Sequence, residues 1–266
     1  KLNYREYWNC VCSFSSELQK YDVAGNRVAI LFKNSLDMAI VYFSVHASGA
    51  QIVPLNPEYT ERELVEILID AEPVLIIFED EFTDITNRVI KKIMKIKSIS
   101  IGPSTWKLDI WKNSNTGKYD NLVPEPDQLA TLQYTGGTSG VPKGVNITHR
   151  QITTNLKQLQ TILPMNQDTE VILCVMPIHH IFASFMCLHT SVFITANLVI
   201  QRRYHPKNLL DAIVSEQVTL LPAGPTVFNS LLNFEKFYDT DFSNMRLAYS
   251  GSAPLSEDIL IKWKKY

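Results

Sequence analysis

The sequence predicts an α/β protein in which helices cover parallel β-sheets. Short apolar runs alternate with amphipathic helical stretches in the order β-α-β-α-β, which is typical of parallel sheets with helices on both faces. The chain has 266 residues, 45% of them hydrophobic and 20% charged. This size favours two domains or one large α/β body, and the composition excludes a disordered or collagen-like chain. A net charge of −2 gives no general electrostatic reason to bind nucleic acid.

Two capping boxes mark helix starts in the first half of the chain. Asn3 stands three residues before Glu6, and Thr60 stands three residues before Glu63, so each pair can satisfy free backbone groups at a helix N-terminus. Apolar residues then recur at helical spacing in the first helix, and the second is expected to run to residue 70. The other elements predicted here are strands at 27–32, 51–55 and 74–78, and a helix that Asn34 or Ser35 caps and that ends at His46.

A polar stretch at residues 112–128 is the best candidate for a domain boundary, because it contains Gly117 and two prolines. We therefore expect a first α/β subdomain at residues 1–125 and a second at 126–266. The alternation of strands and helices resumes after this boundary. The second subdomain is expected to contain strands at 129–134, 171–175 and 218–221, and helices at 151–163, 207–217 and 227–232.

Two further features bear on where the protein resides. The four cysteines form no C-x-x-C pair, so we expect reduced thiols of a cytoplasmic protein rather than a zinc ribbon or a disulfide scaffold. Residues 171–201 contain no Asp, Glu, Lys or Arg. Pro177, several histidines and a β-type patch at 192–194 interrupt this stretch, so it is expected to be buried core and not a membrane-spanning helix.

The segment Tyr134–Gly144, which reads YTGGTSGVPKG, directly follows a predicted strand. Glycines allow backbone N–H groups to approach an anion closely, and successive amides form an anion-binding nest. Thr138 and Ser139 add hydroxyl donors, and Lys143 adds a compact positive charge that suits phosphate oxygens. The pattern predicts a polyphosphate-binding loop. It is not a Walker A loop, because Lys143 follows Pro142.

This loop resembles the signature of the AMP-forming adenylate superfamily, which includes acyl-CoA synthetases, luciferases and peptide-synthetase adenylation domains. The signature runs from Ser or Thr through Gly and hydroxyl residues to a final Pro-Lys-Gly, and Thr135–Gly144 matches it throughout. The form with Gly136 is most similar to long-chain fatty acyl-CoA synthetases. Residues 148–150 resemble the segment that opens the next helix, although Gln151 stands where Asn is common.

Three later blocks extend the resemblance in the expected order. The block 176–183 resembles a Leu-Pro-Leu-x-His-x-Phe motif, which implies that His180 lies near the carboxyl group and acyl chain of the substrate. The block 250–255 resembles the turn that lines the adenine, and the block 222–232 resembles the wall of the acyl pocket. Read alone, the adjacent His179 and His180 would indicate core residues and not metal ligands. By the resemblance, the substrate-binding residues are His180, Pro225, Thr226 and Gly251.

The resemblance also assigns the catalytic and nucleotide-binding residues. The expected catalytic residues are Thr135, Lys143 and His180. The segment 135–143 is expected to stabilise the β- and γ-phosphates of ATP. No metal ligand is expected among these residues. The nucleotide-binding residues are expected to be Thr135, Gly136, Gly137, Thr138, Ser139, Gly140, Lys143, Ser252, Ala253 and Pro254.

The family resemblance implies a two-step reaction. A carboxylate attacks the α-phosphorus of ATP with Mg²⁺, giving acyl-adenylate and pyrophosphate, and the thiol of coenzyme A then displaces AMP. The leading expectation is a long-chain fatty acid:CoA ligase. The alternatives are a fatty acyl-AMP ligase that loads an acyl carrier protein, a medium-chain or aryl-CoA ligase, and a non-catalytic nucleotide- or lipid-binding module.

The resemblance further implies a fold of flavodoxin-like layers that form part of the large N-terminal domain of an adenylate-forming enzyme. The family's C-terminal domain and its magnesium-binding Glu are not among these 266 residues, so we expect this chain alone to have little or no activity. A basic run at Lys91, Lys92, Lys95 and Lys97 is expected to be a solvated helix face. The alternative is peripheral contact with anionic lipid.

Overall fold

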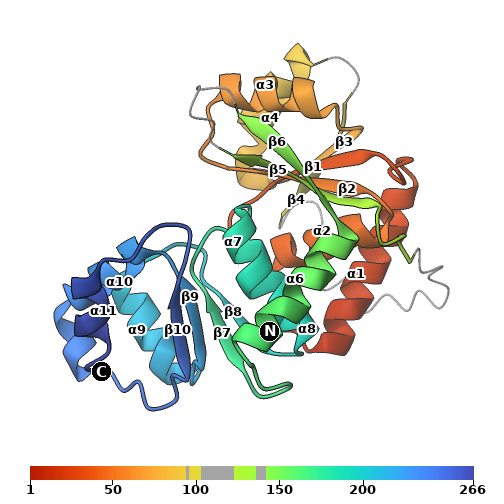
Figure 1. The fold of residues 1–266 in the computed structure, drawn as a ribbon. Coiled ribbons are helices and arrows are strands. Elements are labelled where there is room, and N and C mark those ends of the chain that lie inside the picture. Colours follow the sequence, from red (N-terminus) through yellow and green to blue (C-terminus); the bar gives the residue numbers. More distant parts are fainter. Residues whose placement is uncertain (94–95, 103–122, 136–141) are drawn as a thin grey trace. The chain divides into compact units, whose positions relative to one another are not determined.

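The computed structural model describes residues 1–93, 96–102, 123–135 and 142–266. They form two compact units, Lys1–Asn155 and Leu156–Tyr266. Each unit contains a β-sheet with helices packed against it, as the alternation of the sequence predicts (Figure 1). The α/β class is therefore confirmed.

The first unit contains a six-stranded sheet. Its strands are β1 (Arg27–Leu31), β2 (Gln51–Leu55), β3 (Leu75–Glu79), β4 (Lys97–Ile101), β5 (Leu129–Thr135) and β6 (Lys143–Thr148). Across the sheet they follow the order β4-β3-β1-β2-β5-β6. All neighbours are parallel except β5 and β6, which pair antiparallel.

Among the helices of this unit, those that start at residues 4, 36 and 61 begin where the sequence predicts, the one at 149 begins two residues earlier than expected, and no start was predicted for those at 80 and 83. The helices are α1 (Tyr4–Gln19), α2 (Leu36–Ala47), α3 (Glu61–Ala71), the 3₁₀ turn η1 (Asp80–Phe82), α4 (Thr83–Lys92) and α6 (His149–Ile162), whose last turns extend past Asn155. Both predicted capping boxes are present. The backbone N–H of Glu6 donates to Asn3 Oδ1 and that of Asn3 donates to Glu6 Oε2, each at 2.9 Å.

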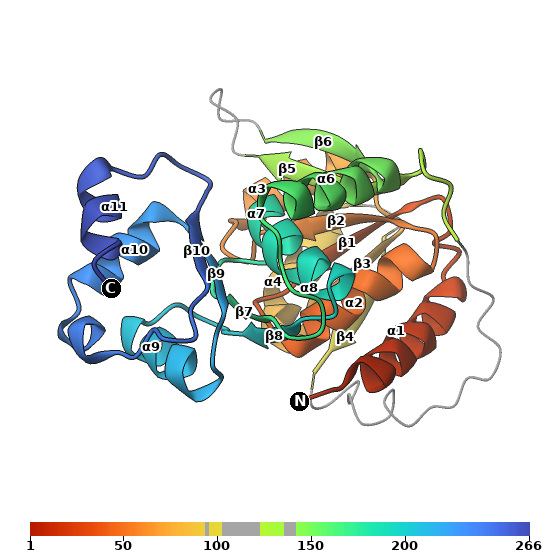
Figure 2. The ribbon, with the colours of Figure 1, turned by 60° about the horizontal axis from the view of Figure 1, so that its bottom comes forward.

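Side chains of the first sheet alternate between its two faces. On one face, Leu31, Val53 and Phe78 belong to a buried cluster that continues into α3 and α4 through Ile67 and Val89. Figures 1 and 2 show α1 and α2 side by side on the other face. The sheet is thus buried on both faces, which explains why its central strands read as nearly continuous apolar runs.

Three features of the first unit differ from the sequence analysis. Residues 143–148 form a strand that the analysis missed, because it is a largely exposed edge strand with little apolar character. The two units part after Asn155, later than the expected boundary at residue 125, because β5 and β6 complete the first sheet. The basic run is not one helix face, since Lys92 ends α4 and Lys97 begins β4.

The second unit contains a four-stranded parallel sheet in the order β10-β9-β7-β8. Its strands are β7 (Val171–Cys174), β8 (Asn197–Ile200), β9 (Leu220–Ala223) and β10 (Leu247–Ser250). Its helices are α7 (Ile181–Ala183), the π-helical turn η2 (Ser184–His189), α8 (Thr190–Phe193), α9 (Pro206–Ser215), α10 (Pro225–Leu232), the 3₁₀ turn η3 (Glu235–Asp239) and α11 (Glu257–Trp263).

One apolar cluster joins α9, α10 and α11 to this sheet, with Leu173 and Leu221 from the strands and Ile213 and Phe228 from the helices. The charge-poor stretch 171–201 folds as β7, the run α7–η2–α8, and β8. The expected β-type patch at 192–194 is wrong, because α8 continues to Phe193. In the part of the chain that the structure describes, we find no helix with the length and apolarity needed to cross a membrane.

Candidate functional site

Two predicted catalytic side chains lie opposite each other at one end of the β5–β6 hairpin. Thr135 ends β5 and Lys143 begins β6, and the two residues are partners in the antiparallel register. Both are exposed. A hydroxyl and an ammonium group therefore stand on neighbouring strands, at the two points that flank the predicted phosphate loop. The other loop residues, Gly136, Gly137, Thr138, Ser139 and Gly140, lie outside the described residues, and their role stays a prediction.

The start of α6 shows how the departure from the family motif is accommodated. The backbone N–H of Thr148 donates to Gln151 Oε1 at 2.8 Å, and the N–H of Gln151 donates to Thr148 Oγ1 at 3.2 Å. This reciprocal pattern is a capping box. Gln151 therefore fixes the beginning of the helix that follows the hairpin.

In the second unit, three predicted segments meet at one edge of the sheet. β7 leads to His180, β9 leads to Pro225, and β10 leads to Gly251. Because these strands are parallel neighbours, their carboxyl ends share one edge, which is where open α/β sheets bind ligands. The N–H of Gly251 donates to the carbonyl oxygen of Ala223 at 3.1 Å, which extends the pairing of β10 and β9 into this edge.

Gly251 is packed too closely for a side chain. A Cβ atom placed there would lie 2.2 Å from Cε2 of Phe182. The ring of Phe182 therefore rests on the backbone of Gly251, and the two motif blocks of the second unit are in direct contact. Gly224, which precedes Pro225, is less crowded, with a Cβ position 3.4 Å from Met176 Cε.

His180 is the N-cap residue of α7. Its Nδ1 accepts a hydrogen bond from the N–H of Phe182 at 3.2 Å. Nδ1 therefore carries no proton in the neutral ring, and Nε2–H is left as a donor. Partial burial lowers the pKa of His180, which favours the neutral form. The ring thus presents a fixed N–H donor at this edge and not a positive charge.

His179 is the more deeply buried of the two histidines. Burial, with a smaller contribution from the charge of His180, lowers the pKa of His179 to about 4. A group with this pKa is neutral at pH 7. The pKa values of both histidines therefore lie below the ordinary value, so each ring favours the neutral form at pH 7.

The turn after β10 has an uncommon backbone conformation. Ser252 has a φ of 68°, in the left-handed region that non-glycine residues rarely adopt. Ser252, Ala253 and Pro254 are all exposed, so this turn can meet a ligand. Strained turns of this kind concentrate at ligand-binding sites.

Two buried polar groups on β10 carry no signal in the sequence. The hydroxyls of Tyr249 and Ser250 are buried and have no hydrogen-bond partner in the described part of the chain. Tyr249 lies near Cys187 of η2, and burial raises its pKa. No spacing or motif distinguishes these two residues from other core positions, so only the fold could reveal them.

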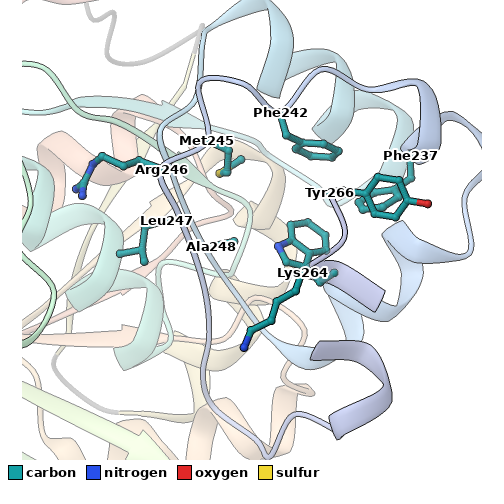
Figure 3. A pocket seen from close by; sticks show the side chains of 9 residues that line it. Phe237, Phe242, Met245, Arg246, Leu247, Ala248, Lys264 and Tyr266 are labelled. Carbon is teal, nitrogen blue, oxygen red and sulfur yellow. The ribbon is translucent and has the colours of Figure 1, made fainter. Parts of the chain in front are cut away.

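A cavity of about 380 Å³ lies at the other end of β10. Figure 3 shows Phe237, Phe242 and Tyr266 grouped on one side of it, while Arg246 points away from them. The Nε of Arg246 donates to Glu170 Oε1 at 3.0 Å, so its charge is engaged with Glu170. Because the cavity adjoins Leu247 at the amino end of β10, it is separate from the predicted site.

The first unit thus supplies a charged hairpin end, and the second unit supplies a sheet edge with two histidines of lowered pKa and a turn of small residues. The model of the AMP-binding enzyme family matches residues 1–266, so the chain belongs to that family.

Curated relatives agree with this assignment. The long-chain-fatty-acid–CoA ligase of Salmonella typhimurium (strain LT2) is 30% identical over 275 residues, and that of Bacillus subtilis (strain 168) is 28% identical over 280 residues. Each alignment covers 91% of this chain and 49% of the relative. The 4-coumarate–CoA ligase 1 of Oryza sativa subsp. japonica is 27% identical over 256 residues, 88% of this chain and 44% of the relative. The chain spans about half the length of the curated relatives it matches.

Solved structures share the fold. ATP-bound MatB from Rhodopseudomonas palustris superimposes with a TM-score of 0.87 at 25% identity, covering 98% of this chain and 52% of that one. The long-chain-fatty-acid-CoA ligase FadD1 from Archaeoglobus fulgidus gives a TM-score of 0.89 at 24% identity, covering 99% and 53%. The N-terminal domain of FACL13 from Mycobacterium tuberculosis gives 0.89 at 21% identity, covering 99% and 66%. The expected fold of an adenylate-forming enzyme's N-terminal domain is thereby confirmed.

Proposed function

We propose that the whole protein containing this chain is an AMP-forming acyl-CoA ligase whose acid is a long-chain fatty acid. The observation that carries the proposal is the meeting of His180, Pro225 and Gly251 at one carboxyl edge of the second sheet. In the first step, a carboxylate oxygen bonds to the α-phosphorus of ATP and the bond to the bridging oxygen breaks, releasing pyrophosphate. In the second, the sulfur of coenzyme A bonds to the acyl carbon, AMP leaves, and the thiol proton is lost.

In this proposal, Thr135 and Lys143 bind the phosphates that leave as pyrophosphate. Their register places a hydroxyl donor and a cation on adjacent strands at one end of the hairpin. Charge that develops on the departing phosphates is stabilised by such fixed donors, because they need little reorganisation during the reaction. The exposure of both side chains leaves them accessible to a polyphosphate.

His180 is proposed to orient the acid by donating from Nε2–H to a carboxylate oxygen. The hydrogen bond from the Phe182 N–H to Nδ1 holds the ring and its tautomer. A neutral donor suits this step better than an imidazolium, since a full positive charge would hold the carboxylate oxygen back from the phosphorus. Ser252, Ala253 and Pro254 are proposed to line the adenine, because they form an exposed turn whose backbone can come close to the base.

Magnesium is assigned to the substrate MgATP and not to a site on these residues. Within residues 1–93, 96–102, 123–135 and 142–266, no group of three His, Cys, Asp or Glu side chains gathers to hold a metal ion. The hydroxyl of Thr135 and the ammonium of Lys143 do not form a metal-ligand set.

The proposal also specifies which carboxylic acid is activated and which thiol accepts the acyl group. Long-chain-fatty-acid–CoA ligases among the relatives, at 28–30% identity, support a long-chain acid and coenzyme A. The similarity to a 4-coumarate–CoA ligase keeps an aryl acid as the second candidate. Transfer to an acyl carrier protein instead of coenzyme A is a further alternative, which acceptor assays would separate.

The test is ATP–pyrophosphate exchange by the whole protein with palmitate, octanoate, benzoate and an amino-acid mixture in parallel. Exchange with palmitate in preference to the others is the expected result. Exchange with benzoate alone would replace the long-chain acid with an aryl acid, and no exchange with any of the acids would contradict the proposal. Adding coenzyme A or an acyl carrier protein to a palmitate reaction then identifies the acceptor by thioester formation.

Two further proposals concern the isolated chain and its location. We propose that residues 1–266 alone have little or no adenylating activity, which the same assay on the purified chain would contradict by robust exchange. We propose a cytoplasmic protein with peripheral membrane contact through Lys91, Lys92, Lys95 and Lys97, of which Lys95 lies outside the residues that the structure describes. Replacing these four lysines with Gln should reduce co-sedimentation with anionic liposomes, and unchanged co-sedimentation would remove the membrane contact.

A further inference from the structure

Tyr134 is the last buried residue of β5 before the exposed Thr135. Its side chain is 6% exposed. Its hydroxyl donates a hydrogen bond to the carboxylate of Asp70, which lies 64 residues earlier in the chain, in the last turn of α3. Burial, followed by the hydrogen bond to Asp70, raises the pKa of Tyr134, so the phenol remains a donor at any pH at which the protein works.

The same ring contacts the strand that carries Lys143. Gly144 is the register partner of Tyr134, and a Cβ placed on Gly144 would lie 3.2 Å from Cζ of Tyr134 and 2.9 Å from Cδ1 of Leu132. The ring of Tyr134 therefore lies against the backbone directly after Lys143. Tyr134 is thus linked to both predicted phosphate-binding residues. It precedes Thr135 in the chain, and its ring contacts Gly144, the residue after Lys143.

The position of Asp70 is unfavourable for α3 itself. A carboxylate in the last turn of a helix lies near the negative end of the helix dipole, and this turn contains no basic residue. Arg27 contributes positive charge nearby, since it opposes part of the rise in the pKa of Tyr134 and donates to the carbonyl oxygen of Ala71 at 2.9 Å. Asp70 is itself exposed, and it accepts the hydrogen bond of Tyr134 at the surface end of that buried ring.

We propose that the Tyr134–Asp70 hydrogen bond positions Thr135 and Lys143 for binding the phosphates of ATP. This inference rests on the proposed function. Tyr134 and Asp70 are positioning residues, because they act through the ends of β5 and β6 and touch no substrate themselves. The bond anchors the hairpin end to α3, while the ring keeps Gly144, and with it Lys143, at a fixed distance from β5.

The first test compares Tyr134→Phe with wild type in the whole protein. Tyr134→Phe keeps the ring that packs on Gly144 and removes only the hydroxyl. We expect about a five- to tenfold increase in KM for MgATP, within the net scale of one ordinary hydrogen bond, with KM for palmitate unchanged within twofold. Asp70→Ala should give the same change, Asp70→Asn a smaller one because its amide oxygen still accepts, and the double variant no more than either single change.

Tyr59→Phe is the matched control. Tyr59 packs against the same apolar cluster as Tyr134, so a general loss of packing would show in both variants. KM for MgATP should stay at the wild-type value in Tyr59→Phe. An unchanged KM for MgATP in Tyr134→Phe, or equal increases in KM for MgATP and for palmitate, would overturn the inference.

Direct ATP binding separates this inference from the proposed function. If wild type shows no exchange with any acid, the proposed reaction fails, and calorimetric titration with ATP then decides the inference by itself. Weaker ATP binding by Tyr134→Phe than by Tyr59→Phe supports the positioning role in that case. Equal ATP binding by the two variants, or no ATP binding by wild type, overturns it.

Discussion

The hairpin end of the first unit and the sheet edge of the second unit differ in charge. At the hairpin end, Thr135 and Lys143 are exposed, and a full positive charge stands beside a hydroxyl. At the sheet edge, partial desolvation lowers the pKa of both His179 and His180, and the ring of Phe182 packs on the backbone of Gly251. The first arrangement suits a highly charged polyphosphate, and the second suits an aromatic base and a carboxylate that must stay reactive.

The two regions also differ in how they are held. An antiparallel pair with a buried tyrosine behind it supports the hairpin end, so its side chains can change without disturbing a core. The sheet edge depends on the contact between Phe182 and Gly251, which leaves no free space. Substitutions at the hairpin end should therefore affect binding alone, whereas substitutions at the sheet edge should affect both binding and packing.

The largest effect is expected for Gly251→Ala. The added methyl would overlap Phe182, so the ring or the turn must move and the segment after His180 would move with it. We expect about a 100-fold loss of pyrophosphate exchange and roughly 1–3 kcal/mol of lost stability, measured by exchange and by urea unfolding. The double variant Gly251→Ala with Phe182→Leu should recover part of both. A wild-type rate of pyrophosphate exchange in Gly251→Ala would show that the contact between Phe182 and Gly251 does not shape the site.

Lys143→Ala should have the next largest effect, but on binding only. Removing one charged contact to phosphate costs about 1.5–3 kcal/mol, which predicts roughly a 10- to 100-fold lower exchange rate at limiting ATP. The melting temperature should change little, because Lys143 is exposed. Lys91→Ala, an exposed lysine at the end of α4, is the control that removes a charge elsewhere. Equal rates for the two variants would contradict a phosphate role for Lys143.

His180→Asn separates the donor from the helix cap. Asn is a good N-cap residue, so α7 should keep its capping bond while Nε2–H is lost. We expect about a tenfold lower exchange rate with palmitate and an unchanged melting temperature. A stable variant with the wild-type rate would show that His180 only caps the helix.

The smallest effect concerns His179 and pH. Its pKa in the folded protein is about 4, below the ordinary value near 6.5, so below pH 6.5 the unfolded chain binds a proton that the folded chain does not. Stability should therefore fall by roughly 1–2 kcal/mol as the pH drops from 7 to 5, and be fully present above 6.5. Urea unfolding at pH 7 and pH 5 measures this loss of stability. His179→Asn should remove the part of the loss that His179 causes, whereas the control His205→Asn, at an exposed position, should keep it. Parallel pH dependence in all three proteins would rule out the burial of His179 as the cause.

The sequence predicted the elements whose signals are local. The capping boxes at Asn3 and Thr60 and the apolar runs of β1 and β2 depend on neighbouring residues, and all four are present. The exposed strand β6 has no such local signal. Its conformation depends on its pairing with β5, which the neighbouring residues do not reveal. The patch at 192–194 was assigned wrongly, since β-branched residues favour strands locally while the preceding π-helical turn continues into α8.

For the site, the motif blocks identified the residues, and the fold added their relations. Only the parallel order of β7, β9 and β10 brings His180, Pro225 and Gly251 to one edge. The tautomer of His180 and the reason for Gly251 depend on contacts with Phe182 that no spacing reveals. Likewise, the bond between Tyr134 and Asp70 joins residues far apart in sequence, so a search along the chain could not find it.

The division of labour between the two regions is tested most directly by measuring KM for MgATP and KM for palmitate in Lys143→Ala and His180→Asn of the whole protein. The account predicts that Lys143→Ala raises KM for MgATP about tenfold or more and leaves KM for palmitate within twofold. It predicts that His180→Asn raises KM for palmitate and leaves KM for MgATP within twofold. Two outcomes would contradict the account: both variants raise the KM for the same substrate, or each variant raises both KM values equally. Either outcome would mean that the hairpin end and the sheet edge do not bind different substrates.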